Sequence, residues 1–234
     1  MMPSNQWQRA RQTRSELVIP PGLVQTWITQ QHEVATRMTE LPYPGLPRFV
    51  AAADAAFSLD GKMCVAVAVV WDREKTELVE HVVARRPLEF PYVPTFLSFR
   101  EGAALQDAIA MLKHAWEVIC FDGQGFAHPR RCGIATHISV MLDRPGIGVG
   151  KSRLCGQARD PGLKAGAWSP LIHRQQQVGI ALRTRDGVKP LFVSVGHRMD
   201  IASARRIVLA CGRGYRLPEP IRIADRITKV ERAK

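Results

Sequence analysis

The chain has 234 residues, which is enough for one large α/β domain, or two small ones, with a sizeable apolar core. Its 33 lysine and arginine residues outnumber 21 aspartate and glutamate residues, and the net charge of +12 is typical of proteins that bind polyanions such as nucleic acid. No apolar run approaches the roughly 20 residues that span a bilayer, and the first residues lack a signal-peptide core, so we expect a cytoplasmic protein without membrane segments.

The first half of the chain reads as one helix followed by strands. Apolar side chains recur at helical spacing over residues 22–38, and the proline-rich segment 41–47 then ends this helix. The Asp60-Gly61 pair is a hairpin signal, so the strands on its two sides should pair antiparallel. Three strands are predicted in this half, at 49–57, 63–71 and 78–84.

The second half alternates helices and strands. A helix is predicted over 101–116 because its apolar residues lie on one face. The strand that ends at Asp122 follows this helical crossover, so it should pair in parallel. The least regular segment is 156–177, which we expect to be a surface excursion. The remaining predicted elements are a helix near 133–142, strands at 146–150, 178–183 and 191–195, and a helix from Asp200 to Cys211.

This order of elements predicts the fold. Three antiparallel strands, a helix and a parallel strand form the order of an RNase H-like core, in which the first and fourth strands are neighbours. We therefore expect an α/β protein with a mixed central sheet and helices on both faces. The RNase H-like domain should span residues 48–228, with a helical lead-in over 1–47 packed on it and a basic tail over 229–234.

Three acidic residues stand where an enzyme that cuts nucleic acid would need them. Asp54 interrupts an apolar run, Asp122 ends an apolar strand, and Glu101 opens the helix between them. A carboxylate at a strand end is costly to bury, and converging carboxylates repel one another unless a divalent cation neutralises them. Glu101 alone is better explained as a residue favoured by the helix dipole, but the three acids together predict a metal site.

Other chemistries find less support in the sequence. Five cysteines without a C-x-x-C pair argue for reduced thiols and against a zinc site, and Cys64 and Cys120 should be small core residues. His128 and His197 are expected to form structural hydrogen bonds rather than to bind a metal, and no serine has the partners of a catalytic triad. Positive charge gathers at Arg130-Arg131, at Lys151 with Arg153, at Arg205-Arg206, and from Arg213 to Lys234.

Several segments of this sequence, taken together, resemble the endonuclease V family. The matching segments are 91–102 with its Pro-Tyr-Val-Pro start, 121–131, 148–154, 196–197 and 216–225. The resemblance runs in order from about residue 48 to about 228. It implies an RNase H-like fold and a DNA repair enzyme that acts on inosine, which is deaminated adenine, in nucleic acid.

The resemblance also implies the reaction and its requirements. The enzyme should cut the second phosphodiester bond on the 3′ side of inosine and leave a 3′-hydroxyl and a 5′-phosphate. It should need Mg²⁺, for which Mn²⁺ substitutes, and no organic cofactor. We expect a monomer whose partner is inosine-containing DNA, with RNA as an alternative.

The family's site residues carry over to matching positions of this chain. The metal-binding acids fall on Asp54 and Asp122, Glu101 completes the catalytic set, and Asp225 matches a fourth catalytic position that holds an acid or a histidine. Tyr92 matches a tyrosine that is pushed into the double helix; its alternative role is a core residue beside other aromatic side chains. Gly123 and Gly125 match glycines that let the extracted base approach the backbone. Contacts to nucleic acid are expected from Pro91, Tyr92, Val93, Pro94, Leu97, Gly123, Gly125, His128 and Lys151.

Two positions depart from the family pattern. Ala52 stands where a glycine is common near the first acid, which is a mild change. Thr95 stands after Pro94, where glycine is frequent, and lies in the lesion-recognition loop. The second departure therefore bears on base selectivity.

Two other functions fit part of the pattern. A junction resolvase of the same fold would have similar acids but would leave the Pro-Tyr-Val-Pro loop unexplained. A lesion-binding module that recruits a partner without cutting would require a lost acid, whereas all of the expected acids are present.

Overall fold

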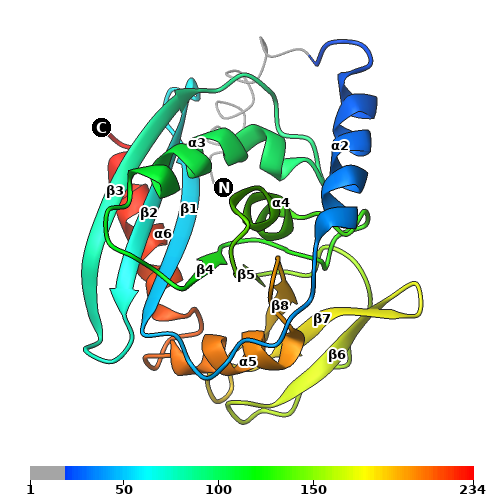
Figure 1. Ribbon diagram of the computed structural model, residues 1–234, viewed down its shortest axis with the longest axis vertical. Coiled ribbons are helices and arrows are strands. Elements are labelled where there is room, and N and C mark those ends of the chain that lie inside the picture. Colours follow the sequence, from blue (N-terminus) through cyan, green and yellow to red (C-terminus); the bar gives the residue numbers. More distant parts are fainter. Residues whose placement is uncertain (1–18) are drawn as a thin grey trace, which may run out of the picture.

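The computed structural model describes residues 19–234, which contain one eight-stranded mixed sheet with helices on both faces (Figure 1). None of the helices in this part of the chain is long and apolar enough to cross a membrane. The strand order is β3-β2-β1-β4-β5-β8-β7-β6. The strands are β1 (Phe49–Phe57), β2 (Met63–Asp72), β3 (Glu77–Pro87), β4 (Val118–Phe121), β5 (Gly146–Gly150), β6 (Trp168–His173), β7 (Gln176–Leu182) and β8 (Leu191–Val195). The helices are α2 (Leu23–Arg37), α3 (Leu97–Met111), α4 (Ile134–Leu142), α5 (Ile201–Ala210) and α6 (Glu219–Glu231).

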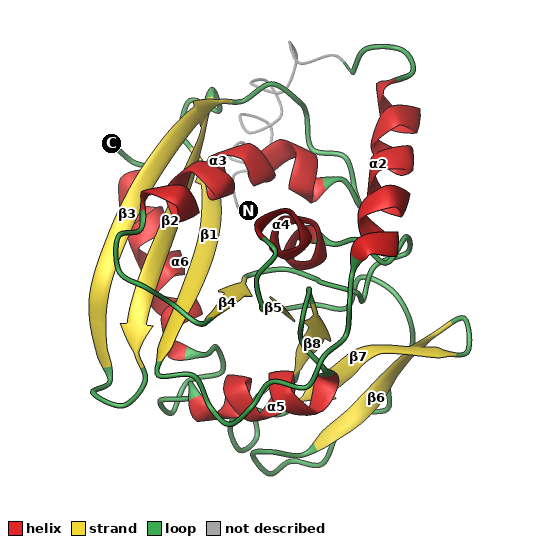
Figure 2. Ribbon diagram, in the orientation of Figure 1, coloured by secondary structure: helices red, strands yellow, loops and turns green. Residues whose placement is uncertain are grey.

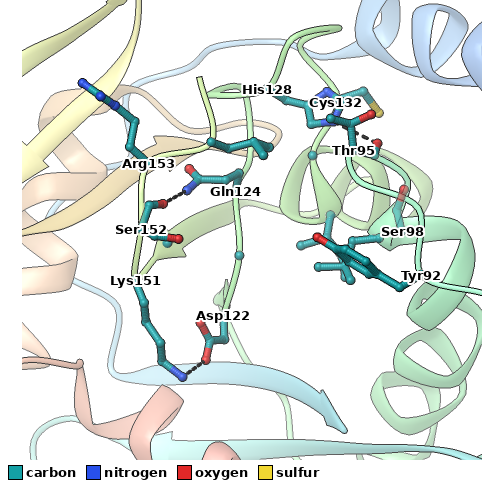
Figure 3. A pocket seen from close by; sticks show the side chains of 16 residues that line it. Tyr92, Thr95, Ser98, Asp122, Gln124, His128, Cys132, Lys151, Ser152 and Arg153 are labelled. Carbon is teal, nitrogen blue, oxygen red and sulfur yellow. Dashed lines mark hydrogen bonds and ion pairs between the residues drawn. The ribbon is translucent and has the colours of Figure 1, made fainter. Parts of the chain in front are cut away.

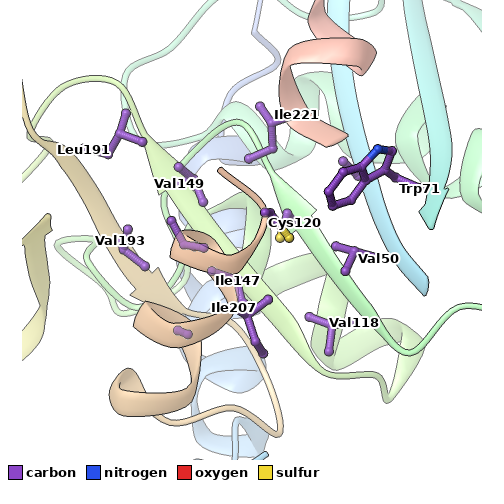
Figure 4. Close-up of a cluster of buried hydrophobic side chains, with 14 of the residues drawn as sticks. Val50, Trp71, Val118, Cys120, Ile147, Val149, Leu191, Val193, Ile207 and Ile221 are labelled. Atoms are coloured by element: carbon purple, nitrogen blue, oxygen red, sulfur yellow. The ribbon is translucent and has the colours of Figure 1, made fainter. Parts of the chain in front are cut away.

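Alternating side chains of the central strands build a separate apolar core on each face of the sheet. On β1, Val50 and Ala52 face α5 and α6, whereas Ala51 and Ala53 face α3 and α4. Figure 2 shows these helical layers, and Figure 4 shows the first core, with Cys120 among its buried residues. The prediction of an α/β protein with a mixed sheet and helices on both faces is confirmed, as is the burial of Cys64 and Cys120 as free thiols.

The pairing of the strands follows the predicted order. β1 pairs antiparallel with β2 across a turn in which Gly61 has a φ of 73°, a conformation that favours glycine. β1 also pairs in parallel with β4, so the first and fourth strands are neighbours as expected. The leading helix predicted over 22–38 is α2.

The helix predicted over 101–116 is shifted along the chain. α3 begins one turn earlier and ends at Met111, so Glu101 lies one turn inside the helix rather than at its start. Beyond the helix, the backbone N–H of His114 donates to the carboxylate of Glu80 on β3 at 2.8 Å. This contact with a distant strand ends the helix before the apolar pattern does.

The segment 156–177 is not wholly irregular, because it contains β6. β6 and β7 form a hairpin whose two turn residues, Arg174 and Gln175, have φ values of 52° and 64°. Positive φ at both positions is the geometry of a type I′ turn, which sequences usually signal with Asn-Gly or a similar pair. The residues of this turn therefore gave no signal from which the hairpin could be predicted.

The sequence pattern also fails to predict α6. Pro218 and Pro220 look like a break in the chain, but proline is tolerated in the first turn of a helix, where no backbone donor is lost. α6 buries Ile221, Ala224 and Thr228, and it packs on β1 and β2. It continues to Glu231, past residue 229, where the sequence placed the start of a basic tail.

Candidate active site

Asp54 of β1 and Asp122, the residue directly after β4, lie side by side. These strands are parallel with Ala53 opposite Phe121, so the next pair in register is Asp54 and Asp122. Neighbouring strands are about 4.8 Å apart. Side-chain alternation places Asp54 on the α6 face of the sheet, because Val50 and Ala52 point to that face. The two acids thus meet at one point, as the strand order predicted.

Glu101 approaches the same two acids from α3 and is buried. Burial raises the pKa of Glu101 to about 8, and repulsion by the charge of Asp54 adds to this shift. Burial likewise raises the pKa of Asp54 to about 7, with repulsion by Asp122 as the second cause. The pKa of Asp122 is raised by burial as well, although Lys151 opposes the shift. The raised pKa values show that the positive charge near the cluster is not enough to keep all three carboxyl groups ionised.

Lys151, which follows β5, places one positive charge at the edge of this cluster. Its Nζ lies 2.5 Å from Oδ2 of Asp122 and 3.2 Å from Oδ1 of Asp225, and Lys229 binds the other oxygen of Asp225 at 2.5 Å. Burial opposes ionisation of Asp225, but these lysines hold its pKa below the usual range. Arg216 donates to the backbone oxygen of Lys151 at 2.7 Å and so fixes the chain at this point.

The donor chemistry of the cluster fits a hard divalent cation. Within residues 19–234, no three His, Cys, Asp or Glu side chains are gathered closely enough to hold a metal ion as they stand. Asp54, Glu101 and Asp122 nevertheless offer only carboxylate oxygens, which Mg²⁺ prefers, and their mutual repulsion is what a cation offsets. A cation bound by Asp122 would replace the ion pair of that carboxylate with Lys151.

A cavity of about 250 Å³ opens directly beside Asp122 (Figure 3). In this view Gln124 and Ser152 stand on one side of the cavity, whereas Thr95 and Tyr92 stand on the opposite side. Pockets for drug-sized ligands measure roughly 300–1,000 Å³, so this volume suits a single nucleobase. Of the positions predicted to contact nucleic acid, the wall includes Tyr92, Leu97, Gly123, His128 and Lys151.

The exposure of Tyr92 decides between its two predicted roles. Its side chain is 57% exposed, so the alternative of a core residue is wrong. The neighbouring aromatic residues Phe90 and Phe96 pack instead around Trp27 of α2, with ring centroids 5.0 and 5.5 Å away. Tyr92 therefore stands free at the mouth of the cavity.

Four other predicted contact positions, Pro91, Val93, Pro94 and Gly125, are not part of the cavity wall. A Cβ at Gly125 would lie 2.2 Å from the carbonyl oxygen of Val195. Close packing against β8 therefore requires this glycine, and its role in base approach stays a prediction. A Cβ at Gly123 would lie 2.6 Å from Cγ2 of Ile134, which is itself a wall residue, so this glycine shapes the cavity.

Both histidines singled out in the sequence form structural hydrogen bonds, as predicted. His128 donates from Nε2 to the backbone oxygen of Thr95 at 3.0 Å, and its Nδ1 accepts from the backbone N–H of Arg130 at 3.2 Å. Burial lowers the pKa of His128 to about 4, so the ring is neutral. His197 accepts at Nδ1 from the backbone N–H of Thr39 at 3.2 Å.

Three residues of the site region were missed by sequence reasoning. Gln31 of α2 and Arg130 contact the loop that carries Thr95, and Thr228 of α6 forms a side-chain hydrogen bond with Asp54. Arg130 belonged to a visible basic cluster, but its charge did not reveal its partners. A polar residue on the buried face of a helix, as Gln31 is, was the one available signal.

Comparisons with known proteins place the chain in a family. The Endonuclease V family model matches residues 31–226. The endonuclease V of Roseiflexus sp. (strain RS-1) is 46% identical over 206 residues, which cover 88% of this chain and 91% of that relative. The crystal structure of endonuclease V from Streptomyces avermitilis has a TM-score of 0.84 at 37% identity and covers 88% of this chain and 92% of its own.

A third comparison includes a bound nucleic acid. A variant of Ciona intestinalis endonuclease V, in complex with a 23-mer DNA containing an inosine followed by a ribo-adenosine, has a TM-score of 0.82 at 27% identity. The match covers 92% of this chain and 98% of that one. With the family model matching most of the sequence, the chain belongs to the endonuclease V family and is a nuclease that hydrolyses phosphodiester bonds.

Proposed function

We propose that this enzyme is a DNA repair nuclease that cuts nucleic acid at inosine. It hydrolyses the second phosphodiester bond on the 3′ side of inosine and leaves a 3′-hydroxyl and a 5′-phosphate. The observation that carries the proposal is a base-sized cavity that shares Asp122 with the carboxylate cluster. The complex of Ciona endonuclease V with inosine-containing DNA supports the same substrate class.

The acidic cluster is assigned to Mg²⁺, for which Mn²⁺ can substitute. Asp54, Asp122 and Glu101 would hold the ion, and Asp225 is a fourth catalytic residue. When bound, a divalent cation supplies an activated water and neutralises charge on the leaving oxygen. With Asp122 bound to a cation, Lys151 would lose its ion pair with that carboxylate and would be available to contact a phosphate of the substrate.

The cavity and Tyr92 are assigned to base recognition. An enzyme that reads the pairing edge of a base must extract the base from the stack, at a cost of a few kcal/mol. Tyr92 is exposed at the cavity mouth, and the prolines on its two sides restrict the loop backbone. Its ring fills the gap that the extracted base leaves, while Leu97, Gly123 and His128 form part of the wall that receives the base.

One experiment tests this function and its alternatives. End-labelled strands with and without a single inosine are incubated, single- and double-stranded and as DNA or RNA, with Mg²⁺, Mn²⁺ or EDTA. We expect cutting at the second bond 3′ to inosine, and only when a divalent cation is present. The enzyme itself is expected to be a monomer that acts in the cytoplasm. Binding without cutting would instead support the recruitment module, and cutting confined to branched DNA would support a junction resolvase.

A further inference from the structure

Tyr215 is an exposed aromatic residue in the loop 212–218, which leads from α5 into α6. It is 51% exposed, whereas Leu217, two residues further along the chain, packs against the core on the α6 face of the sheet. The loop is therefore anchored while the ring of Tyr215 stands in solvent. A single exposed apolar side chain is common on protein surfaces, so the groups around Tyr215 decide what its ring can bind.

The ring of Tyr215 is held in place by Arg222 of α6. The Cζ atom of Arg222 lies over the ring, 4.3 Å from its centroid. Arg222 is itself fixed by Glu219, whose carboxylate oxygens accept from its Nε at 2.9 Å and from its Nη2 at 2.5 Å. The ring is thus a flat apolar surface in a fixed orientation, and stacking on it costs little side-chain entropy.

The residue that follows Tyr215 joins the loop 212–218 to the carboxylate cluster. Arg216 donates from Nη2 to the backbone oxygen of Lys151 at 2.7 Å, and Nζ of Lys151 lies 2.5 Å from Oδ2 of Asp122. Burial lowers the pKa of Arg216, and the charge of Asp122 opposes this shift, so the two groups are close enough to interact. Tyr215 is therefore one residue away from a side chain that senses the cluster.

α6 extends the surface that borders the cluster. Arg222 precedes Asp225 by three residues, so the two side chains share one face of the helix. Lys151 reaches from the cavity wall toward α6 (Figure 3), where its Nζ contacts Asp225 at 3.2 Å. The residues of α6 and of the loop 212–218 lie outside the cavity wall. The ring of Tyr215 is thus placed beside the cluster but apart from the cavity.

The proposed reaction fixes which part of a bound strand reaches this surface. Inosine occupies the cavity, and the second phosphodiester bond on its 3′ side lies at the cluster, which shares Asp122 with the cavity. The strand that continues past the cluster is then the part on the 3′ side of the cut. In a single-stranded substrate the bases of this part are unpaired and free to stack on an aromatic ring.

We propose that Tyr215 is a further nucleic-acid-binding residue, a platform on which a base from the 3′ side of the cut stacks. This inference rests on the proposed cutting at inosine. Every base has an apolar face, so the ring of Tyr215 binds the strand regardless of its sequence. The base in the cavity holds the strand on one side of the scissile bond and the platform holds it on the other, which keeps the bond at the cluster.

The test removes the stacked base and the ring separately and together. Single strands with one inosine are prepared with an abasic site at the first, second or third nucleotide beyond the cut, or with none. Fluorescence anisotropy in EDTA measures the affinity for each strand, and KM and kcat are measured separately with Mg²⁺. Tyr215→Ala removes the ring, whereas Tyr215→Phe keeps it without the hydroxyl group. Thermal melting checks folding, and Tyr215→Leu, which lacks an aromatic face, serves if the alanine variant does not fold.

Trp168→Ala is the matched control. Trp168 is also exposed, at 45%, and the Cζ atom of Arg205 lies 5.4 Å from the centroid of its ring. It belongs to β6, at the edge of the sheet and three strands away from β5, which Lys151 follows. The loss of this ring should therefore leave affinity and cutting near their wild-type values.

We expect one of the abasic sites to weaken binding by the wild type about tenfold, because a base stacked on an aromatic ring contributes that much affinity. Tyr215→Ala should bind the intact strand about tenfold more weakly and should lose nothing further at that abasic site. KM should rise more than kcat falls, and Tyr215→Phe should stay within about threefold of the wild type.

Unchanged affinity for the intact strand in folded Tyr215→Ala, or losses from the abasic site and from the variant that simply add, would overturn the inference. A wild type that shows the position dependence in binding but cuts no strand would support the platform and defeat the proposed function alone.

Discussion

Asp122 of the carboxylate cluster and Thr95 both line the cavity, but the cluster and the loop at Thr95 are completed in different ways. In the cluster, burial and mutual repulsion raise the pKa of Asp54 to about 7 and that of Glu101 to about 8. In the loop, the strained backbone of Thr95 is held by hydrogen bonds from Gln31, His128 and Arg130. The carboxylate cluster, which we call the reacting end of the site, thus depends on the positive charge of a bound cation. The loop at Thr95, which we call the recognition end, is already held in place by the protein.

Removing an acid of the cluster should have the largest effect on the cutting rate and should leave binding of the inosine strand intact. Asp122→Ala is expected to lower the cutting rate about 10³-fold or more, because a metal ligand contributes several kcal/mol to transition-state stabilisation. Binding of an inosine strand should be retained or strengthened, since a charge that repels phosphate is lost. Gel-based cutting assays and anisotropy in EDTA measure the two quantities.

Asp107→Ala is the matched control for this substitution. Asp107 is an acid of α3 that pairs with Arg86 on β3, outside the cluster, so its loss should leave cutting near the wild-type rate. Near-normal turnover by folded Asp122→Ala protein would refute the assignment of Asp122 to the metal.

Burial of the cluster, together with the repulsion within it, predicts a pH dependence of stability without divalent cations. The folded state keeps the protons of Asp54 and Glu101 up to pH 7 to 8, whereas the unfolded chain loses them near pH 4. The folded state binds more protons in this window, so the free energy of unfolding should fall as pH rises, by on the order of 2 kcal/mol per site between pH 5 and 7.

Urea denaturation in EDTA at a series of pH values measures this effect. Glu101→Gln should flatten the profile and raise stability at pH 8, and Mg²⁺ should flatten the wild-type profile by stabilising the ionised carboxylates. A wild-type profile that is flat from pH 5 to 8 in EDTA would show that burial and repulsion do not raise the pKa of these two acids.

Tyr92→Ala tests whether the tyrosine ring assists the extraction of a base from the double helix. Stacking of an aromatic side chain on a base contributes about 1–3 kcal/mol, so we expect a loss of about 10–100-fold in kcat/KM on duplex inosine substrates. Single strands, which need no unstacking from a partner, should lose less. Because the side chain is exposed, the melting temperature should change little. Equal losses on both substrates with a large drop in stability would contradict the wedge.

The smallest effect is expected from Lys151, which lies at the edge of the cluster. Each phosphate contact contributes about −0.9 to the slope of log K against log salt on duplex DNA. Lys151→Ala should reduce the steepness of this slope by about one unit and weaken binding on inosine-containing and undamaged strands alike. Anisotropy titrations from low to physiological salt measure it. A flat wild-type slope would mean that the basic surface does not contact phosphates.

The sequence by itself determined the features that depend on the residue pattern of each element and on the order of elements along the chain. Continuous apolar runs predicted β1, β2 and β4, and the intervening helix favoured parallel pairing of β1 with β4. Because side-chain direction alternates along a strand, the pairing alone implied that Asp54 and Asp122 would meet. The family motifs identified the cavity loop and its tyrosine from residue identity.

Only the tertiary structure decided how these parts are joined. Lys151 contacts Asp225 across 74 positions of sequence, and Gln31 contacts the backbone of Thr95 across 64. The turn of Arg174 and Gln175 closes the pairing of β6 with β7 without a turn signal in the sequence. α6 is stabilised by its packing on β1 and β2. The strain at Thr95 has the same origin, since no local preference favours threonine at positive φ and only distant hydrogen-bond donors hold it there.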